Sequence, residues 1–276
     1  MRRQRRITGP LVVLSVAIPA VAWTAIRPSN DRTWIAEQAR TATASFAGRE
    51  VVIHNVRNFD WSSAHDPVPR WERRVYDLDR IESIWYVLSP FGDRFRGPAH
   101  ALLSFGFEDG QYVAVSIEAR KEVGEEYSLF KGMLKRFELM YVIGDERDLI
   151  RLRTDRYGDE VYLYPVRATP EAARTLFVEM LEAANQLARE PAFYGTIRDN
   201  CTTRILHHAN RVSPERIRYG LRILLPGYSD ALALEAGLLD TDLPLEAARN
   251  RYRINSLVRT YADDPEFSRR IRNRRR

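Results

Sequence analysis

Two stretches in which apolar residues alternate with polar or small ones are the clearest pattern in the chain. They are "AHALLSFGF" (99–107) and "QYVAVSIEA" (111–119), and only "EDG" separates them. Alternation with a period of two is typical of β-strands, and a short loop with glycine joins such strands into an antiparallel hairpin. Further strands are predicted for "REVVIHNVRNF" (49–59), "KRFELMYVIG" (135–144) and "VYLYPV" (161–166). The apolar stretch 75–90 suits either a strand or a helix.

Helical spacing replaces the alternation after these strands. Thr169 and Pro170 suit the N-cap and first position of a helix, and Pro191 ends it. Between them, apolar residues recur at intervals of three and four: Ala173, Leu176, Phe177, Met180, Leu181, Ala184 and Leu187. A second helix is predicted to begin at Cys201, with Asp199 or Asn200 as its cap. Strands followed by helices predict an α+β fold in which an antiparallel sheet packs on helices.

The N-terminus has the composition of a targeting segment. "MRRQRR" is followed by an uncharged stretch, 7–26, which is long enough to span a bilayer. Arginines before such a stretch stay in the cytoplasm, so the rest of the chain is expected on the other side of the membrane. We expect one uncleaved hydrophobic helix that anchors the protein. The alternative is a signal peptide with "AVA" (20–22) as its cleavage site.

Composition divides the chain into five parts. We expect an anchor or signal segment, a polar linker, a main domain, a helical C-terminal extension built from short helices and loops, and a basic tail: 1–26, 27–48, 49–212, 213–268 and 269–276. The tail, "RRIRNRRR", either contacts anionic lipid or is a disordered solubilising segment.

The net charge of +6 comes from the two ends of the chain. Ten arginines account for it: Arg2, Arg3, Arg5, Arg6, Arg269, Arg270, Arg272, Arg274, Arg275 and Arg276. Without them the remainder is slightly acidic, so we expect no nucleic-acid-binding surface. No group of residues has the spacing of a metal site, and no motif indicates a cofactor.

Cys201 is the only cysteine of the chain. Exported proteins usually pair their cysteines, so a single thiol is either an inert buried residue or a reactive one. A helix N-terminus favours thiolate, and its free N–H groups can bind an oxyanion. At this position the N–H groups of Cys201 and Thr202 are the candidate donors.

A catalytic thiol needs a base within hydrogen-bonding reach. His207 and His208 follow closely, but they lie roughly 9–10 Å further along the same helix. Neither His54 nor His65 has a partner pattern. His100 has one: if "EDG" is a three-residue loop, paired residue numbers sum to 218 and His100 faces Glu118. The alternative is a surface pair between Glu118 and a nearby arginine such as Arg120.

The remaining candidates carry less chemistry. Charge alternation in "GDERDLIRLR" (144–153) is typical of a solvated or salt-bridged strand and turn. Arg120 and Arg147 are candidates to hold a lipid phosphate. Ser104 is a poor nucleophile, because no GxSxG motif surrounds it.

Several segments together resemble the Lnb N-terminal periplasmic domain family. They are "RPSNDRTW", "NVRNF", "AHALLSFGFEDGQYVAVSIEARKEVGEEYS", "FELMYVIGDERDLIRLRT", "VYLYP" and "DNCTTRIL", in this order between about residues 27 and 210. The resemblance implies a membrane-attached, extracytoplasmic protein with a permuted papain-like (NlpC-type) cysteine fold. It also implies thiol-dependent acyl transfer on a membrane lipid or lipoprotein, since a lipoprotein N-acyltransferase belongs to the family. It assigns Cys201 as the nucleophile, His100 as the base and Glu118 as its acid.

Two other functions suit the same residues. The first is a cysteine peptidase or amidase acting on cell-wall peptide, and the second is a scaffold whose cysteine is structural. The scaffold predicts that His100 and Cys201 lie far apart, whereas both enzymes require contact between their side chains.

Overall fold

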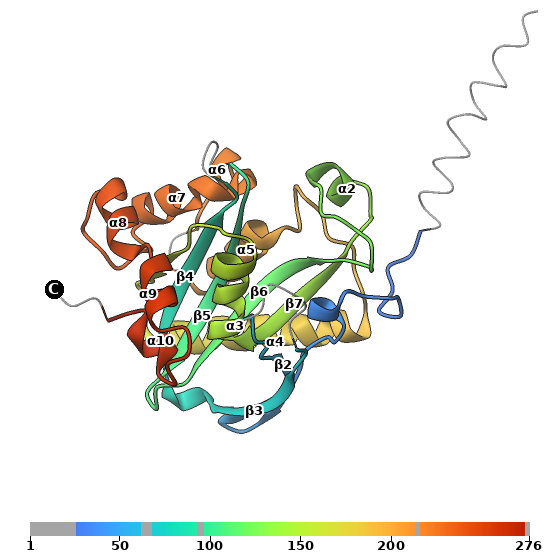
Figure 1. Ribbon diagram of the computed structural model, residues 1–276, viewed down its shortest axis with the longest axis horizontal. Helices are drawn as coiled ribbons and strands as arrows, with labels where there is room; N and C mark the ends of the chain where they lie inside the picture. Colours follow the sequence, from blue (N-terminus) through green and yellow to red (C-terminus); the bar gives the residue numbers. More distant parts are fainter. Residues whose placement is uncertain (1–25, 62–67, 93–96, 214–215, 274–276) are drawn as a thin grey trace, which may run out of the picture.

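The computed structural model describes residues 26–61, 68–92, 97–213 and 216–273, and it has the predicted α+β architecture. One mixed sheet is covered by helices on both faces (Figure 1). Its strands are β1 (Thr43–Ala47), β2 (Glu50–Arg57), β3 (Trp71–Asp77), β4 (Ile81–Pro90), β5 (Ala99–Phe107), β6 (Tyr112–Arg120), β7 (Glu138–Asp145) and β8 (Tyr162–Pro165).

The strand order is β1-β2-β7-β6-β5-β4-β8, and β3 pairs with β2 beside this path. Most neighbouring strands are antiparallel, and β2 meets β7 in parallel at Arg57 and Gly144. Every residue of β5 is buried, because this strand lies between β4 and β6 with helices on both sides.

Helices cover the two faces of the sheet unequally. The long helices α4 (Pro170–Arg189) and α5 (Cys201–Val212) pack against the face that carries Leu103 and Phe105. The opposite face, with Leu102 and Met140, is covered by α3 (Glu146–Arg151), α9 (Asn255–Thr260) and α10 (Phe267–Arg270). Shorter elements complete the fold: α2 (Leu129–Met133), α6 (Leu221–Leu224), α7 (Ser229–Glu235), α8 (Leu245–Tyr252), a π-helical turn (Leu152–Arg156) and 3-10 turns (Ala36–Gln38, Leu78–Arg80, Pro226–Tyr228).

The two strongest sequence patterns are confirmed. The β5–β6 hairpin has the predicted register, with Leu102 opposite Ser116, and Gly110 adopts the left-handed conformation in its loop. Helix α4 begins after Thr169, whose side chain accepts a hydrogen bond from the N–H of Ala172. The ambiguous stretch 75–90 is extended: it comprises the end of β3, a 3-10 turn and β4.

The prediction for 144–153 is confirmed for the salt bridges and wrong for the strand. A strand occupies only its first two residues, because the side chain of Asp145 accepts from the N–H of Arg147 and starts α3. The charges are also largely buried: Asp148 accepts hydrogen bonds from Arg57, from the N–H of Phe59 and from the Trp61 indole. Alternating charges therefore belong here to buried ion pairs and not to a solvated edge.

The terminal parts predicted as linker, extension and tail contribute to the packed body. Strand β1, within 27–48, pairs with β2. Ile254, Val258 and Phe267 belong to the core on one sheet face.

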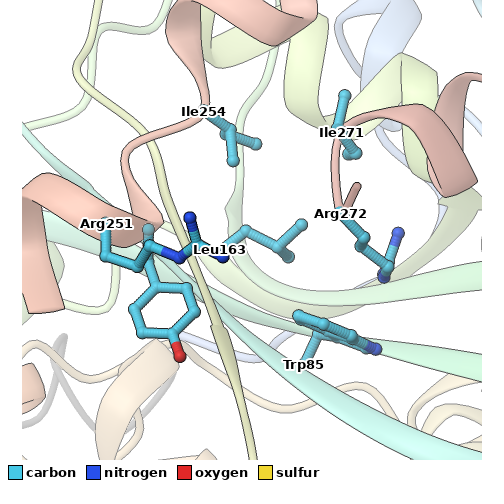
Figure 2. A pocket seen from close by; sticks show the side chains of 7 residues that line it. Trp85, Leu163, Arg251, Ile254, Ile271 and Arg272 are labelled. Atoms are coloured by element: carbon cyan, nitrogen blue, oxygen red, sulfur yellow. The ribbon is translucent and has the colours of Figure 1, made fainter. Parts of the chain in front are cut away.

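Arg272, in the predicted basic tail, is neither a lipid contact nor solvated. It forms a bidentate ion pair with Glu146, and its guanidinium lies 3.8 Å from the Tyr112 ring. The guanidinium also lies 4.5 Å from the Trp85 ring, and Figure 2 shows these two side chains beside each other.

The predicted N-terminal anchor falls almost entirely on residues outside the described ranges. Among the described residues, no helix has the length and apolar character needed to cross a bilayer.

Candidate active site

Helix α5 begins at Cys201 because the residues around it cap it. The Asn200 side chain accepts from the N–H of Thr203, 2.9 Å away, and the Thr203 hydroxyl accepts from the N–H of Asn200. This reciprocal capping fixes Cys201 at the first helical position, where the N–H groups of the first turn point away from the helix. The thiol is buried.

The β5–β6 hairpin supplies the groups that face this helix start. Pairing of the two strands runs from Gly106–Tyr112 to Leu102–Ser116. Beyond it, His100 Nε2 lies 2.6 Å from Ser116 Oγ and 3.2 Å from Glu118 Oε1. The Ser116 hydroxyl donates to Glu118 Oε1 at 2.6 Å. Since that hydroxyl proton is used on Glu118, this hydrogen-bond pattern assigns a proton to Nε2, which leaves Nδ1 of the neutral ring as the proton acceptor.

The Cys201 thiol and the His100 ring line the same cavity, and each shifts the pKa of the other. Burial raises the pKa of the thiol, but the hydrogen bond and charge of His100, together with the N–H of Ala101, lower it overall. Burial and Arg153 lower the pKa of His100, whereas Glu118 and the Cys201 hydrogen bond raise it, and the net shift is upward. Opposite shifts of the two pKa values favour a thiolate–imidazolium pair.

Glu118 stabilises this pair as an anion. Burial raises the pKa of its carboxyl, but the charge and hydrogen bond of His100, followed by Arg153 and Ser116, lower it far below its usual range. The carboxylate therefore remains charged at neutral pH and holds the imidazolium in place.

A cavity of about 330 Å³ opens onto these side chains. Cys201, His100 and Glu118 line it together with the aromatic residues Phe91, Tyr127, Tyr157 and Tyr194 and the charged residues Lys121, Arg153 and Asp159. The thiol is therefore buried against the protein and accessible to a ligand in the cavity.

Arg153 and Asp159 were not expected at this site. Arg153 Nη2 lies 3.4 Å from Glu118 Oε1, and its guanidinium lies 5.2 Å from the Tyr157 ring. Asp159 accepts from the Ser89 hydroxyl at 2.8 Å, and burial raises the pKa of its carboxyl. Both residues follow α3, and their charges carried no sequence signal that distinguished them from surface residues.

A model of the Lnb N-terminal periplasmic domain matches residues 68–227, which is more than half of the chain. The chain belongs to the Lnb N-terminal periplasmic domain family. The matched segment includes His100, Ser116, Glu118 and Cys201, and its periplasmic character supports an extracytoplasmic body. No functionally curated protein and no solved structure matches the chain.

In this member of the Lnb N-terminal family, Arg120 and Arg147, the predicted phosphate-binding pair, have different surroundings. Arg120 is buried, donates to the carbonyls of Gln38 and Ala39, and lies 4.1 Å from the Trp34 ring. Burial lowers its pKa to about 10. Arg147 lines a different surface cavity, beside Arg74 and Asp145. Neither lines the Cys201 cavity.

Thr202 has a structural contact in addition to its predicted role. Its buried hydroxyl lies 2.9 Å from Asn200 Oδ1 and 2.8 Å from the carbonyl of Ile223. It thus joins the first turn of α5 to α6. The backbone N–H of Thr202 remains a candidate oxyanion donor.

The two histidines beside Cys201 in the sequence face elsewhere, as helical geometry requires. His208 Nε2 is hydrogen-bonded to the Tyr141 hydroxyl at 2.7 Å, and His207 is exposed. Among the residues that the structure describes, no cluster of potential ligands could hold a metal ion.

Proposed function

We propose that the protein is an extracytoplasmic, membrane-attached cysteine acyltransferase that acts on acyl esters of lipids or lipoproteins. The observation that carries the proposal is that Cys201, at the first position of a helix, lines one cavity with His100 and Glu118, which lie 3.2 Å apart, and that His100 lowers the pKa of the thiol. Family membership supports the periplasmic location. The uncharged segment 7–26 supports membrane attachment.

The first half-reaction forms an acyl-enzyme. The Cys201 thiolate attacks the ester carbonyl carbon, and the resulting oxyanion accepts hydrogen bonds from N–H groups at the start of α5. As the carbon–oxygen bond breaks, the His100 imidazolium gives its proton to the leaving alkoxide. The products are a thioester on Cys201, a free alcohol and neutral His100.

The second half-reaction releases the acyl group. An amine attacks the thioester carbonyl, neutral His100 takes the proton that the amine loses, and the carbon–sulfur bond breaks to restore the thiolate. The acyl chain ends in an amide. If water attacks in place of the amine, the product is a carboxylic acid and the net reaction is hydrolysis.

The chain order of the site supports a permuted papain-like relationship, which we include in the proposal. His100 and Glu118, on the sheet, precede Cys201, on the helix. The proposed base and acid therefore come before the nucleophile in the chain, and the nucleophile lies at the start of a helix that packs on the sheet.

Lipoprotein mass spectrometry tests the proposal. Cells with the wild-type protein, with Cys201→Ala and without the protein are compared for N-acylated lipoprotein termini. A hydroxylamine-labile acyl adduct is sought on Cys201 of the purified protein. The matched control is His208→Gln, which changes a buried histidine outside the site. Equal lipoprotein acylation with wild type and Cys201→Ala contradicts the proposal, and a released cell-wall peptide in place of an acyl product favours the amidase.

A further inference from the structure

We propose that the end of the molecule that carries the Cys201 cavity lies on an anionic phospholipid bilayer through an exposed apolar surface. Ten of the seventeen large hydrophobic side chains exposed in the described part of the chain lie on three short segments there. These ten define the α2–α6 surface: Val123, Tyr127, Leu129, Phe130, Met133, Leu134, Ile197, Tyr219, Leu221 and Leu225. Leu221 is 75% and Phe130 64% exposed, although both are fully apolar side chains.

Two hydrogen bonds join the three segments into one band. The Thr196 hydroxyl donates to the carbonyl of Leu129 at 2.8 Å, which joins α2 to the segment before α5. The Tyr219 hydroxyl donates to the carbonyl of Ile197, which joins that segment to the one before α6. Figure 1 shows α2 and α6 along the same upper edge of the molecule. A contiguous exposed apolar patch on a folded domain marks an interaction site.

Charge on the band favours an anionic partner. Lys131 lies within α2, Arg198 follows Ile197, and Arg218 precedes Tyr219, and all three are exposed. Apolar and aromatic side chains interleaved with lysine and arginine are typical of surfaces that insert shallowly among lipid headgroups. Each cation near an anionic leaflet adds roughly 1 kcal/mol of attraction.

The path of the N-terminal part of the chain also favours a bilayer over a second copy of the protein. The N–H of Val123 donates to the carbonyl of Thr33 at 2.8 Å, and the N–H of Ile35 to the carbonyl of Lys121 at 3.1 Å. The uncharged stretch 7–26 therefore joins the body close to one edge of the α2–α6 surface. If that stretch spans the bilayer, it leaves only a few residues between the membrane and Val123.

Docking in this way gives the cavity a direct route to lipid. Tyr127 belongs to the α2–α6 surface and also lines the cavity, where its ring packs edge-on against Tyr194 with centroids 6.2 Å apart. An acyl ester held in the outer headgroup layer would reach Cys201 past these two rings without crossing water. The surface is inferred from exposure, charge and chain path, so it does not depend on the chemistry proposed for Cys201.

Site-directed spin labelling of the full chain tests the surface. In a Cys201→Ser background, which removes the native thiol, single cysteines replace Phe130 and Leu221. Controls replace Val75 and Leu243, which are also apolar and are each 39% exposed but lie outside the band. Each protein is reconstituted in vesicles of phosphatidylethanolamine and phosphatidylglycerol. Collision of the label with lipid-soluble oxygen is then compared with collision with an aqueous nickel chelate.

We expect labels at 130 and 221 to lie about 5–10 Å below the phosphate level and the control labels to lie in water. We also expect the labels to become shallower when phosphatidylcholine replaces phosphatidylglycerol. Accessibility to nickel equal to that of the controls overturns the proposal. Protection from both reagents, with dipolar broadening between labels, assigns the surface to a second copy and also overturns it. Equal depth in both lipid mixtures overturns the electrostatic part. Because Cys201 is replaced by serine in every protein tested, none of these outcomes depends on catalysis.

Discussion

Two buried histidines of this protein have opposite acid–base behaviour. His100 on β5 and His208 on α5 are 6% and 5% exposed, and each has a carboxylate nearby. The pKa of His100 is raised, because the pull of Glu118 and Cys201 exceeds the effects of burial and Arg153. The pKa of His208 is lowered to about 4 by burial and by the charges of His207, Arg204 and Arg211.

The two rings are equally buried, so the difference comes from the neighbouring charges and hydrogen bonds. Glu118 lies 3.2 Å from His100 Nε2, with Ser116 bridging the two. Glu179 is 3.8 Å from His208 Nδ1, and that nitrogen has no hydrogen-bond partner among the described residues. A carboxylate thus makes a buried imidazole basic only where it can accept the ring proton. The surroundings of His100 favour its protonated form, and those of His208 favour its neutral form.

The largest expected effect is on acyl-transfer activity, which should depend on His100 and not on His208. Cys201→Ala and His100→Ala should each lower acyl transfer by at least about a thousandfold, because the nucleophile or its base is lost. His208→Gln should leave the rate per folded molecule unchanged. Acyl-product formation by purified protein is measured by mass spectrometry. Comparable losses in the His208 and His100 variants would remove the functional distinction between them.

The next effect concerns stability against pH. The folded pKa of His208 is about 4 and its ordinary value is 6.5, so the unfolded chain binds more protons between these values. Stability should therefore fall as pH drops through this window, by about 3 kcal/mol for this residue, and not further below it. His100 has a raised pKa and acts in the opposite direction: its contribution is complete below 6.5 and is lost as pH rises through the raised value.

Urea unfolding of wild type and His208→Gln between pH 7 and pH 4 measures this effect. The difference between the two proteins isolates His208 from the other acid-sensitive groups. Parallel pH profiles would show that His208 is not held neutral in the folded state.

A smaller effect is expected at the carboxylate. Glu118→Gln removes the negative charge beside His100, so the pKa of His100 should fall. The charge of Glu118 by itself raises the pKa of Cys201, but the lowering by His100 is the larger effect, so weakening the His100 cation should raise the thiol pKa overall. If the pKa of the thiol rises by about one, the thiolate population falls about tenfold at a pH below the midpoint. The rate of Cys201 alkylation by iodoacetamide, measured as a function of pH, gives the pKa of the thiol as its midpoint. The wild-type midpoint should lie below the ordinary thiol value of 9, and the variant midpoint above that of wild type.

The smallest effect tests the helix start. Asn200→Ala removes the cap of α5 and should cost about 1 kcal/mol of stability and raise the Cys201 midpoint. Thr169→Ala removes the matching cap of α4 and should cost a similar amount without moving the midpoint. Identical alkylation profiles in the two variants would indicate that the cap has no part in the chemistry.

Local rules were enough to find His100 beside Glu118. The loop length of the hairpin fixes its register, and neither residue needs a distant partner to be placed. Helical rise was likewise enough to exclude His207 and His208. Arg153 and Asp159 could not be found in this way. Their positions at the site depend on how the preceding elements, β7 and α3, pack in the fold, and local sequence patterns do not predict that packing. Arg120 misled for the same reason: its partners Gln38 and Ala39 precede it by some eighty residues.

The ion pair between Arg272 and Glu146 has a consequence for the timing of folding. A chain exported from its N-terminus delivers Glu146 well before Arg272. Until the arginine arrives, a carboxylate that is fully buried in the folded protein has no counter-ion, which costs about 3–5 kcal/mol in a closed core. Packing of the α3 face of the sheet is therefore expected to be completed only after residue 272 has been delivered, which makes it one of the last steps of folding.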